Sequence, residues 1–360
     1  VEDALYNNTD ITIKLLEYFY TKFNPVVQMA DREGKLTEIK NSIHELLEAV
    51  NSLNEDRIVR SLLGTIEATV RTNYFQQDEA GMHKNSISLK FHSAKVPDLP
   101  LPKPVFEIFV YSTFVEAIHL RGDKIARGGI RWSDRPEDFR TEVLGLMKAQ
   151  QVKNAVIVPL GAKGGFVVKQ DLSALTSREE KSKVVIECYK TFMRGLLDIT
   201  DNYQGAKVVR PKNTICWDKE DPYLVVAADK GTATFSDIAN GISKEYGFWL
   251  DDAFASGGST GYDHKKMAIT AKGGWISVTR HFAEMGINVQ KDPITTIGIG
   301  DMSGDVFGNG MLLSETIKLV AAFNHAHIFI DPNPDTAISF KERKRLFETP
   351  GSKWSDYNPA

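Results

Sequence analysis

The 360-residue chain has few cysteines, little net charge and no long apolar segment. Cys188 and Cys216 are its only cysteines, too few for a disulfide framework or a cysteine-rich zinc site. The formal net charge is −3, so no broad field is available to attract nucleic acid or an anionic membrane. No stretch approaches the roughly 20 apolar residues that a membrane helix needs. We therefore expect a cytoplasmic protein that contacts neither nucleic acid nor membrane and holds charged ligands in local sites.

Neither end of the sequence has the pattern of a complete enzyme. The chain begins Val1-Glu2-Asp3, without an initiator methionine or a signal-peptide pattern. At the other end, one strand–helix–strand unit is followed by too few residues to complete a dinucleotide-binding domain. These features predict a fragment of a longer polypeptide.

Hydrophobic periodicity divides the chain into three predicted parts. Residues 1–75 have apolar side chains at three- and four-residue steps, which is typical of amphipathic helices. Residues 76–255 alternate strands and helices, and we expect an α/β substrate-binding and catalytic domain with a mixed sheet. Residues 256–360 follow a Gly/Ser cluster, and they have the pattern of a partial Rossmann-type NAD-binding domain that is truncated at its C-terminus. The predicted fold class is α/β, preceded by a helical segment.

Individual elements follow from the same patterns. A helix is predicted to begin at Ser133 or Asp134 with Pro136 in its first turn, and a glycine-rich loop is predicted at residues 159–165. Further helices are expected at 176–197 and from the second glycine-rich segment to about 319. Strands are expected at residues 86–92, 105–111, 115–120, 155–158, 223–227, 294–299 and 327–330.

A glycine-rich segment at residues 296–304 is the candidate cofactor site. Gly298, Gly300 and Gly304 follow a predicted strand, where glycines allow a tight turn and a close approach of the backbone to a pyrophosphate. Asp331 is predicted at the tip of the second strand, where an acid binds the adenosine ribose and favours NAD over NADP. The alternative is a glycine turn that serves only a strand-to-helix bend. The remaining candidate cofactor-binding residues in this loop are Asp301 and Ser303.

Three cationic residues and one acidic residue, in four separate segments, are the candidates for substrate binding and proton transfer. Arg127 precedes two glycines, Lys153 ends a helix, and Lys163 and Asp229 each follow a predicted strand, where ligands bind in open α/β sheets. A lysine crowded by other cations has a lowered pKa and can shuttle protons during amino-acid dehydrogenation, with an aspartate opposite it serving the nitrogen. The candidate catalytic residues are Lys163 and Asp229, and the candidate substrate-binding residues are Arg127, Gly128, Gly129 and Lys153.

Each of these residues also has a plainer interpretation. Lys153 alone is typical of a solvated helix end, and Asp229 alone of a helix cap. Lys163 does not belong to a P-loop, because Gly164 stands where that motif requires Ser or Thr. Arg131 is interpreted as bracing a nearby carboxylate and is left out of the site. The eight histidines show no metal-ligand spacing, so no metal is expected.

The segment that joins these residues resembles a known family. Residues 126–166, ARGGIRWSDRPEDFRTEVLGLMKAQQVKNAVIVPLGAKGGF, closely resemble the large-subunit NAD-specific glutamate dehydrogenases. They are more distantly similar to the small hexameric glutamate dehydrogenases and their leucine and phenylalanine relatives. By this resemblance, Lys163 and Asp229 match the catalytic lysine and aspartate, and Lys153 the ligand of the substrate α-carboxylate. Arg127 stands where the small enzymes have a lysine for the side-chain carboxylate, and Thr270 matches a threonine near the nicotinamide.

The resemblance implies reversible oxidative deamination of L-glutamate to 2-oxoglutarate and ammonium, with NAD as hydride acceptor. It also implies a homo-oligomer for the full-length protein. One alternative is a dehydrogenase of an apolar amino acid, against which Arg127 argues, because an apolar side chain would leave that cation unpaired. A second alternative is a catalytically silent assembly scaffold.

Overall fold

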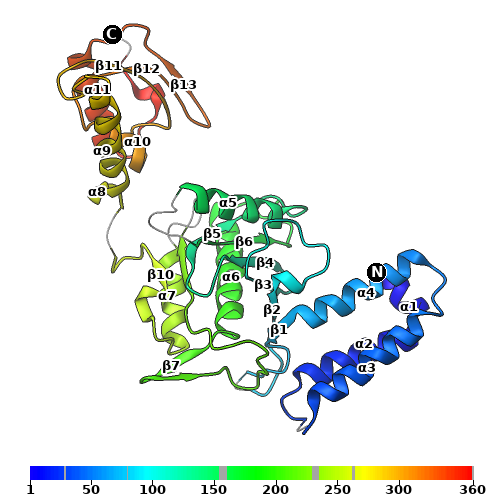
Figure 1. The fold of residues 1–360 in the computed structure, drawn as a ribbon. Coiled ribbons are helices and arrows are strands. Elements are labelled where there is room, and N and C mark those ends of the chain that lie inside the picture. The colour runs from blue at the N-terminus through cyan, green and yellow to red at the C-terminus, as the bar shows by residue number, and fades with distance from the viewer. Residues whose placement is uncertain (28–29, 79, 154–159, 229–234, 262–263, 359–360) are drawn as a thin grey trace. The chain divides into compact units, whose positions relative to one another are not determined.

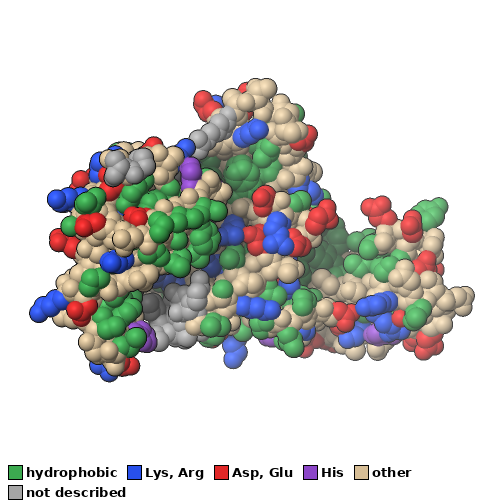
Figure 2. Space-filling model, turned by 90° about the horizontal axis from the view of Figure 1, so that it is seen from above, with side chains coloured by type: hydrophobic (Ala, Val, Ile, Leu, Met, Phe, Trp, Pro, Cys, Tyr) green, Lys and Arg blue, Asp and Glu red, His purple; other side chains and the backbone are tan. Residues whose placement is uncertain are grey.

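The computed structural model describes residues 1–27, 30–78, 80–153, 160–228, 235–261 and 264–358 (Figure 1). It divides into two units, Val1–Thr260 and Gly261–Ala360. The predicted strand at 155–158 and Asp229 lie outside the described residues, as does the side chain of Lys153. Basic and acidic side chains are interspersed on the face shown in Figure 2, as the small net charge leads one to expect.

The described residues before the first strand form four helices, and the helical character of this segment agrees with its periodicity. Asp31 caps the third helix by accepting a hydrogen bond from the Gly34 amide, and Ser52 caps the fourth in the same way. Ile39, Ile43 and Val59 are buried where the helices meet. The helices are α1 (Glu2–Asn7), α2 (Thr9–Phe23), α3 (Arg32–Leu47) and α4 (Leu53–Ala68).

The described residues of the first unit form an eight-stranded mixed sheet in the order β1-β2-β3-β4-β6-β5-β9-β10. The first four strands form an antiparallel meander, and β6 adds to β4 antiparallel. Strands β6, β5, β9 and β10 are parallel to one another. The strands are β1 (Thr69–Thr72), β2 (Ile87–His92), β3 (Phe106–Tyr111), β4 (Val115–Arg121), β5 (Arg127–Trp132), β6 (Ala162–Val168), β9 (Val225–Ala228) and β10 (Ala255–Ser256).

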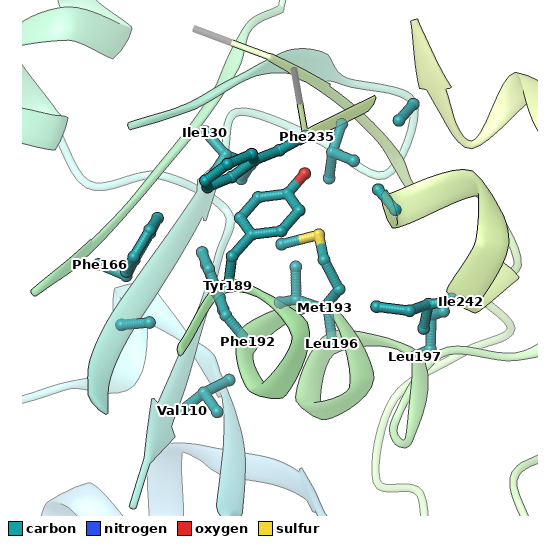
Figure 3. Packing of buried hydrophobic residues seen from close by; sticks show 14 of the residues in the cluster. Val110, Ile130, Phe166, Tyr189, Phe192, Met193, Leu196, Leu197, Phe235 and Ile242 are labelled. Atoms are coloured by element: carbon teal, nitrogen blue, oxygen red, sulfur yellow. The ribbon is translucent and has the colours of Figure 1, made fainter. Parts of the chain in front are cut away.

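Helices cover both faces of this sheet. On one face α6 (Arg178–Leu197) and α7 (Ser236–Glu245) pack against the strands. Figure 3 shows Tyr189 of α6 between Phe166 of the sheet and Phe235 at the start of α7, and the Phe192 ring also contacts Phe166. On the other face, α5 (Phe139–Lys153) buries Val143 and neighbouring apolar residues against β4 and β6.

A buried ionic cluster fastens the segment between residues 199 and 223 to the antiparallel half of the sheet. Arg71 binds Asp201 at 2.7 Å, and Arg121 binds Asp221 at 2.6 Å. Lys90 joins the two pairs through Asp221 at 2.7 Å and through Asp218. All six side chains are at most 7% exposed, and three cations balance three carboxylates. The charges are therefore compensated within the cluster, as burial requires.

The second unit contains a small sheet in the order β11-β12-β13. β11 (Ile294–Ile299) and β12 (Ile317–Phe323) are parallel, with α10 (Asp305–Gly310) between them in the sequence. β13 (Ile328–Ile330) returns antiparallel to β12. The other helices of this unit are α8 (His264–Met267), α9 (Ile269–Glu284) and α11 (Thr336–Glu348). The structure thus confirms the α/β fold class and a strand–helix–strand unit in this region.

Several predicted elements are wrong in detail. The segment around Lys163 is strand β6 rather than a glycine-rich loop, and residues 127–132 form a strand that the sequence did not indicate. Residues 317–323 were expected to lie near the end of a helix but form β12. Helix α5 begins at Phe139, because a turn closed by the Asp138 amide and the Arg135 carbonyl precedes it. The hairpin of β7 (Asn202–Gln204) and β8 (Lys207–Val209) was not predicted.

Candidate active site

Lys163 is the second residue of β6, where it pairs with Leu120 of β4. Gly165 lies two residues further on the same face, and a Cβ on it would come within 2.5 Å of Val143 Cγ2 on α5. Gly164 faces the other way, and a Cβ there would meet Ile130 Cδ1 at 2.4 Å. The two glycines therefore allow close packing on both faces of the sheet, and Lys163 stands half-buried on the α5 side.

Arg127 lies on the adjacent parallel strand and on the same side of the sheet. It forms a β-bridge with Gly161, two residues before Lys163, and Ile130 pairs with Gly164. Since alternate residues share a face, Arg127 and Lys163 both lie on the α5 side. A Cβ at Gly128 would lie 1.5 Å from the Ala162 carbonyl oxygen, so this glycine permits the close approach of the two strands. Gly129 is buried and pairs with Ala227 of β9.

The strand that leads to Asp229 joins the same part of the sheet. Ile130 of β5 pairs with Ala228 of β9 on one side and with Gly164 of β6 on the other. The residue before Asp229 and the residue after Lys163 therefore share one row across the sheet. The expectation that both candidates follow carboxyl ends of strands is wrong for Lys163, which lies near the start of β6.

Gln150 is a polar residue that the sequence interpretation missed. Its Nε2 donates a hydrogen bond of 3.0 Å to the Arg127 carbonyl, which fixes the last turn of α5 beside β5. Its Oε1 is buried and has no hydrogen-bond partner among the described residues. Lys153, the final residue of α5, follows one helical turn later. The feature that identifies Gln150 is this acceptor without a described partner close to Lys153. It becomes evident only once α5 is packed against the sheet, so the sequence could not indicate it.

Arg131 braces a carboxylate, as predicted. Its Nη1 donates to Glu142 Oε1 at 2.8 Å, and the Ser133 hydroxyl donates to Glu142 Oε2 at 2.5 Å. Burial by itself would raise the pKa of Glu142, but these hydrogen bonds from Ser133 and Arg131 outweigh it and lower the pKa. Glu142 is therefore a fixed anion that holds β5 against α5.

In the second unit, the glycine-rich turn connects β11 to α10. Gly300 has a φ of 137°, which favours glycine, and a Cβ there would lie 2.9 Å from Phe307 Cβ. A Cβ at Gly298 would meet the Phe307 ring at 2.3 Å. Both glycines thus let α10 pack on β11. Gly304 is the residue before α10, and a Cβ there would meet only the Asp301 carbonyl oxygen, at 3.4 Å.

Polar side chains within this turn bind one another. Asp301 accepts hydrogen bonds from the Ser303 amide and hydroxyl, and from Asn324 Nδ2 at 2.8 Å. Burial favours a higher pKa for Asp301, yet these hydrogen bonds lower the pKa, so the residue remains an anion. Lys265 brings a cation to the same turn, because its Nζ donates to the Ser303 carbonyl at 2.8 Å. A phosphate group would meet one cation and one anion here.

Asp331 follows the strand predicted at residues 327–330, but this strand is not the second parallel strand of the sheet. The second parallel strand is β12, and Asp331 follows the antiparallel strand β13. Its amide donates to the Val320 carbonyl within β12, so it does not lie at the carboxyl end of that strand. Asn324 follows β12 directly. Asp331 instead lines a pocket of about 870 Å³ with Trp354 and neighbouring residues.

Thr270 is exposed in the first turn of α9. This helix contacts α10, which begins after the glycine-rich turn. Both cysteines have free thiols. Among the described residues, no group of His, Cys, Asp and Glu is arranged to hold a metal ion. In the same part of the chain, no helix is both long and apolar enough to span a bilayer.

Together these features define an α/β protein with a cationic site on a mixed sheet and a glycine-rich strand–turn–helix–strand unit. The family model described as "Bacterial NAD-glutamate dehydrogenase, catalytic domain" matches residues 42–360. The chain belongs to this family.

Relatives from several bacteria match along the whole chain. The chain is 61% identical over 360 residues to the NAD-specific glutamate dehydrogenase of Pseudomonas aeruginosa and 58% identical to that of Halomonas elongata. It is 52% identical to the corresponding protein of Mycobacterium tuberculosis. Each match covers 99% of this chain and 22% of the relative, so the chain spans about a fifth of their length. A hetero-hexameric glutamate dehydrogenase structure from Thermus thermophilus has 15% identity over 86% of this chain and 66% of its own, with a TM-score of 0.43.

Proposed function

We propose that the protein to which this chain belongs catalyses reversible oxidative deamination of L-glutamate to 2-oxoglutarate and ammonium, with NAD as hydride acceptor. The observation that carries the proposal is the pair of cations, Lys163 and Arg127, on one face of adjacent strands. Gln150 fixes the end of α5, and with it the backbone of Lys153, beside this pair. Three cations suit a substrate with two carboxylates and a reacting centre between them.

The roles follow from position and chemistry. We assign the substrate α-carboxylate to Lys153 and the side-chain carboxylate to Arg127, with the backbone of Gly128 and Gly129 alongside. Lys163 polarises the carbonyl or carbinolamine oxygen and moves a proton at that atom. Asp229 exchanges protons with the substrate nitrogen. We add Gln150, whose Oε1 has no hydrogen-bond partner among the described residues and can accept a hydrogen bond from the substrate ammonium group.

We place the cofactor on the second unit. NAD supplies the hydride acceptor when it is bound. Residues 300–304 fit its pyrophosphate, because the only atom near a Cβ at Gly304 would be the Asp301 carbonyl oxygen, among the described residues, and because Lys265 offers a cation that offsets Asp301. Thr270 is assigned to the nicotinamide end. Asp331 stays an untested candidate for the ribose.

The test is NADH formation by the full-length protein with glutamate, leucine or phenylalanine. We expect glutamate to be preferred and Lys163→Ala to lower kcat by at least about 100-fold, the scale of a lost acid–base group. Lys148→Ala, an exposed lysine on α5, is the matched control and should leave kcat unchanged. Equal rates with leucine would instead indicate a dehydrogenase of apolar amino acids. Full activity in Lys163→Ala would contradict the assigned chemistry, and no activity with any substrate would favour a scaffold.

We further propose that the full-length protein is a cytoplasmic homo-oligomer. The two free thiols, one buried and one half-buried, suit a reducing compartment.

A further inference from the structure

A second pocket lies in the first unit, lined by parts of the chain other than the predicted catalytic residues. Its volume is about 600 Å³, within the range of small-molecule sites. Its walls come from the loop between β1 and β2, the end of α6, the β7–β8 hairpin with the residues after it, and the end of α7. Figure 1 shows β7 beside the C-terminal end of α7. No role assigned above uses this pocket.

The acidic group in this pocket is already neutralised. The Asp198 side chain is 3% exposed and accepts hydrogen bonds from Lys84 Nζ at 3.0 Å and from the Tyr246 hydroxyl at 2.8 Å. Asn73 Nδ2 donates to its other oxygen at 2.9 Å. These three donors leave Asp198 little capacity to attract a cationic ligand.

Two further cations line the pocket wall. Arg210 donates to the Asp218 carbonyl oxygen and the Cys216 thiol, and within the described part of the chain neither Arg210 nor Lys212 forms an ion pair with a carboxylate. With Lys84 and Asp198 compensating each other, the lining has a net charge of about +2 in a chain whose net charge is negative. Amide side chains of Gln77 and Gln204 add donors without charge. The pocket is therefore suited to an anion.

The remaining wall is apolar and fixed in place. Val209 and Tyr203 of the hairpin line it together with Phe248, which is almost fully buried. Asn202 holds the hairpin to the end of α7, since its Nδ2 donates to the Gly247 carbonyl at 2.8 Å and its Oδ1 accepts from the Trp249 amide. A bare inorganic ion would leave most of this volume unfilled, so an organic body belongs beside the anionic group.

The pocket is connected by one helix to the segment that contains Asp229. Tyr246 and Phe248 line the pocket directly after α7, whose 10 residues span about 15 Å. The other end of α7 begins at Ser236, seven residues after Asp229. A ligand that contacts Tyr246 and Phe248 thus acts on the helix that continues from the predicted catalytic aspartate.

We propose that this pocket is an effector site for a small organic anion, a phosphate ester or a carboxylate with an apolar body, that alters catalysis through α7. The effector role rests on the proposed function, whereas binding does not. Arg210 and Lys212 bind the anionic group, and Val209, Tyr203 and Phe248 contact the organic body.

Binding is measured by titration calorimetry on the full-length protein, with phenyl phosphate and phenylacetate as probes that distinguish the two kinds of anion. We expect saturable binding of at least one probe and at least about tenfold weaker binding to Arg210→Gln/Lys212→Gln, the effect of losing one charged contact. Lys207→Gln/Lys219→Gln removes the same charge outside the lining and should change binding less than about twofold. Val209→Trp keeps the charge and fills the pocket, so it should also abolish binding.

Glutamate oxidation is then measured with and without saturating probe. We expect kcat or KM to change in the wild type and in the Lys207/Lys219 control, and to stay constant in the two pocket variants. Lack of saturable binding by both probes, or equal weakening in the control, overturns the site. Binding with unchanged kcat and KM overturns the effector role. If the protein oxidises no glutamate, the proposed function fails, and calorimetry still decides whether the pocket binds anions.

Discussion

His119 is a fully buried histidine on β4, next to the strand that carries Lys163. It pairs with Gly164 in the sheet, but neither ring nitrogen has a hydrogen-bond partner among the described residues. Burial, and secondarily the charge of Arg121, lower its pKa from 6.5 to about 3. The imidazole therefore stays neutral in the folded protein throughout the physiological range.

This residue should make stability depend on pH. The unfolded chain takes up a proton near pH 6.5 and the folded chain only near pH 3, so the free energy of unfolding falls as pH drops through that window. From pH 7 to pH 5 the loss from His119 alone should be about 2 kcal/mol. Urea unfolding of the 360-residue chain at both pH values measures it.

The matched variants separate His119 from other titrating groups. His119→Leu should remove this loss, and at pH 7 it removes no hydrogen bond to a described residue. His83→Leu, at an exposed position, should keep the wild-type pH dependence. A pH dependence that persists in His119→Leu would show that the histidine is not the titrating group.

At the scale of elements, β6 and α5 pack closely because Gly165 has no side chain. Gly165→Ala places a methyl group 2.5 Å from Val143 Cγ2, and such overpacking costs about 1–3 kcal/mol. Val143→Ala alone leaves a cavity and also destabilises. The double variant should be more stable than the sum of the two effects predicts, because each change relieves the other. Urea unfolding of the four proteins measures this coupling, and strict additivity would contradict the direct contact.

Strands β2, β3 and β4 were predicted correctly from the alternation of apolar and polar residues in the sequence, and their boundaries match within about one residue. Strands β3 and β4 are nevertheless buried on both faces along most of their length. Strand β5 begins with Arg127-Gly-Gly, which has no such pattern, and tertiary packing against Ala162 makes it a strand. Residues 317–323, IKLVAAF, are nearly all apolar, and periodicity alone does not distinguish strand from helix in such a run.

The candidate site was predictable in residue type and only partly in position. The motif around Lys163 singled out the lysine as a candidate but predicted a loop. Glycines often mark turns, whereas here Gly164 and Gly165 lie in a strand and allow close packing. Gln150 could not be found, since its role depends on the end of α5 approaching β5. Asp331 does follow the predicted strand, β13, but this strand was taken for the second parallel strand because β12 was taken for the end of a helix.

At the scale of the whole molecule, the sheet of the second unit has an exposed apolar face. Ile297 and Ile299 of β11 are 70% and 75% exposed, and Ile328 and Ile330 of β13 are 79% and 68% exposed. Contiguous apolar surface of this kind favours association in water. The 360-residue chain should therefore bind a hydrophobic dye and self-associate as its concentration rises.

Charged side chains introduced on this apolar face should reduce both dye binding and self-association. Ile297→Lys/Ile299→Lys should lower dye fluorescence and shift light scattering toward the monomer. Thr37→Lys/Ser61→Lys adds the same charge at exposed helical positions of the first unit and should change neither signal. Equal reductions in both double variants would mean that net charge, rather than this face, controls association.

The strand order of the large sheet also has a consequence for synthesis. Strands β1 to β4 are neighbours both in sequence and in space, so this meander can form as soon as residue 121 has left the ribosome. Strand β5 cannot join the sheet at that stage, because both of its partner strands, β6 and β9, are translated later. Arg127 and Lys163 can come together once β6 has emerged, but the sheet around them closes only after residue 228. The part of the sheet that carries Arg127 and Lys163 therefore forms after the antiparallel meander, and any pause in translation before β9 exposes glycine-rich β5 as an unpaired edge.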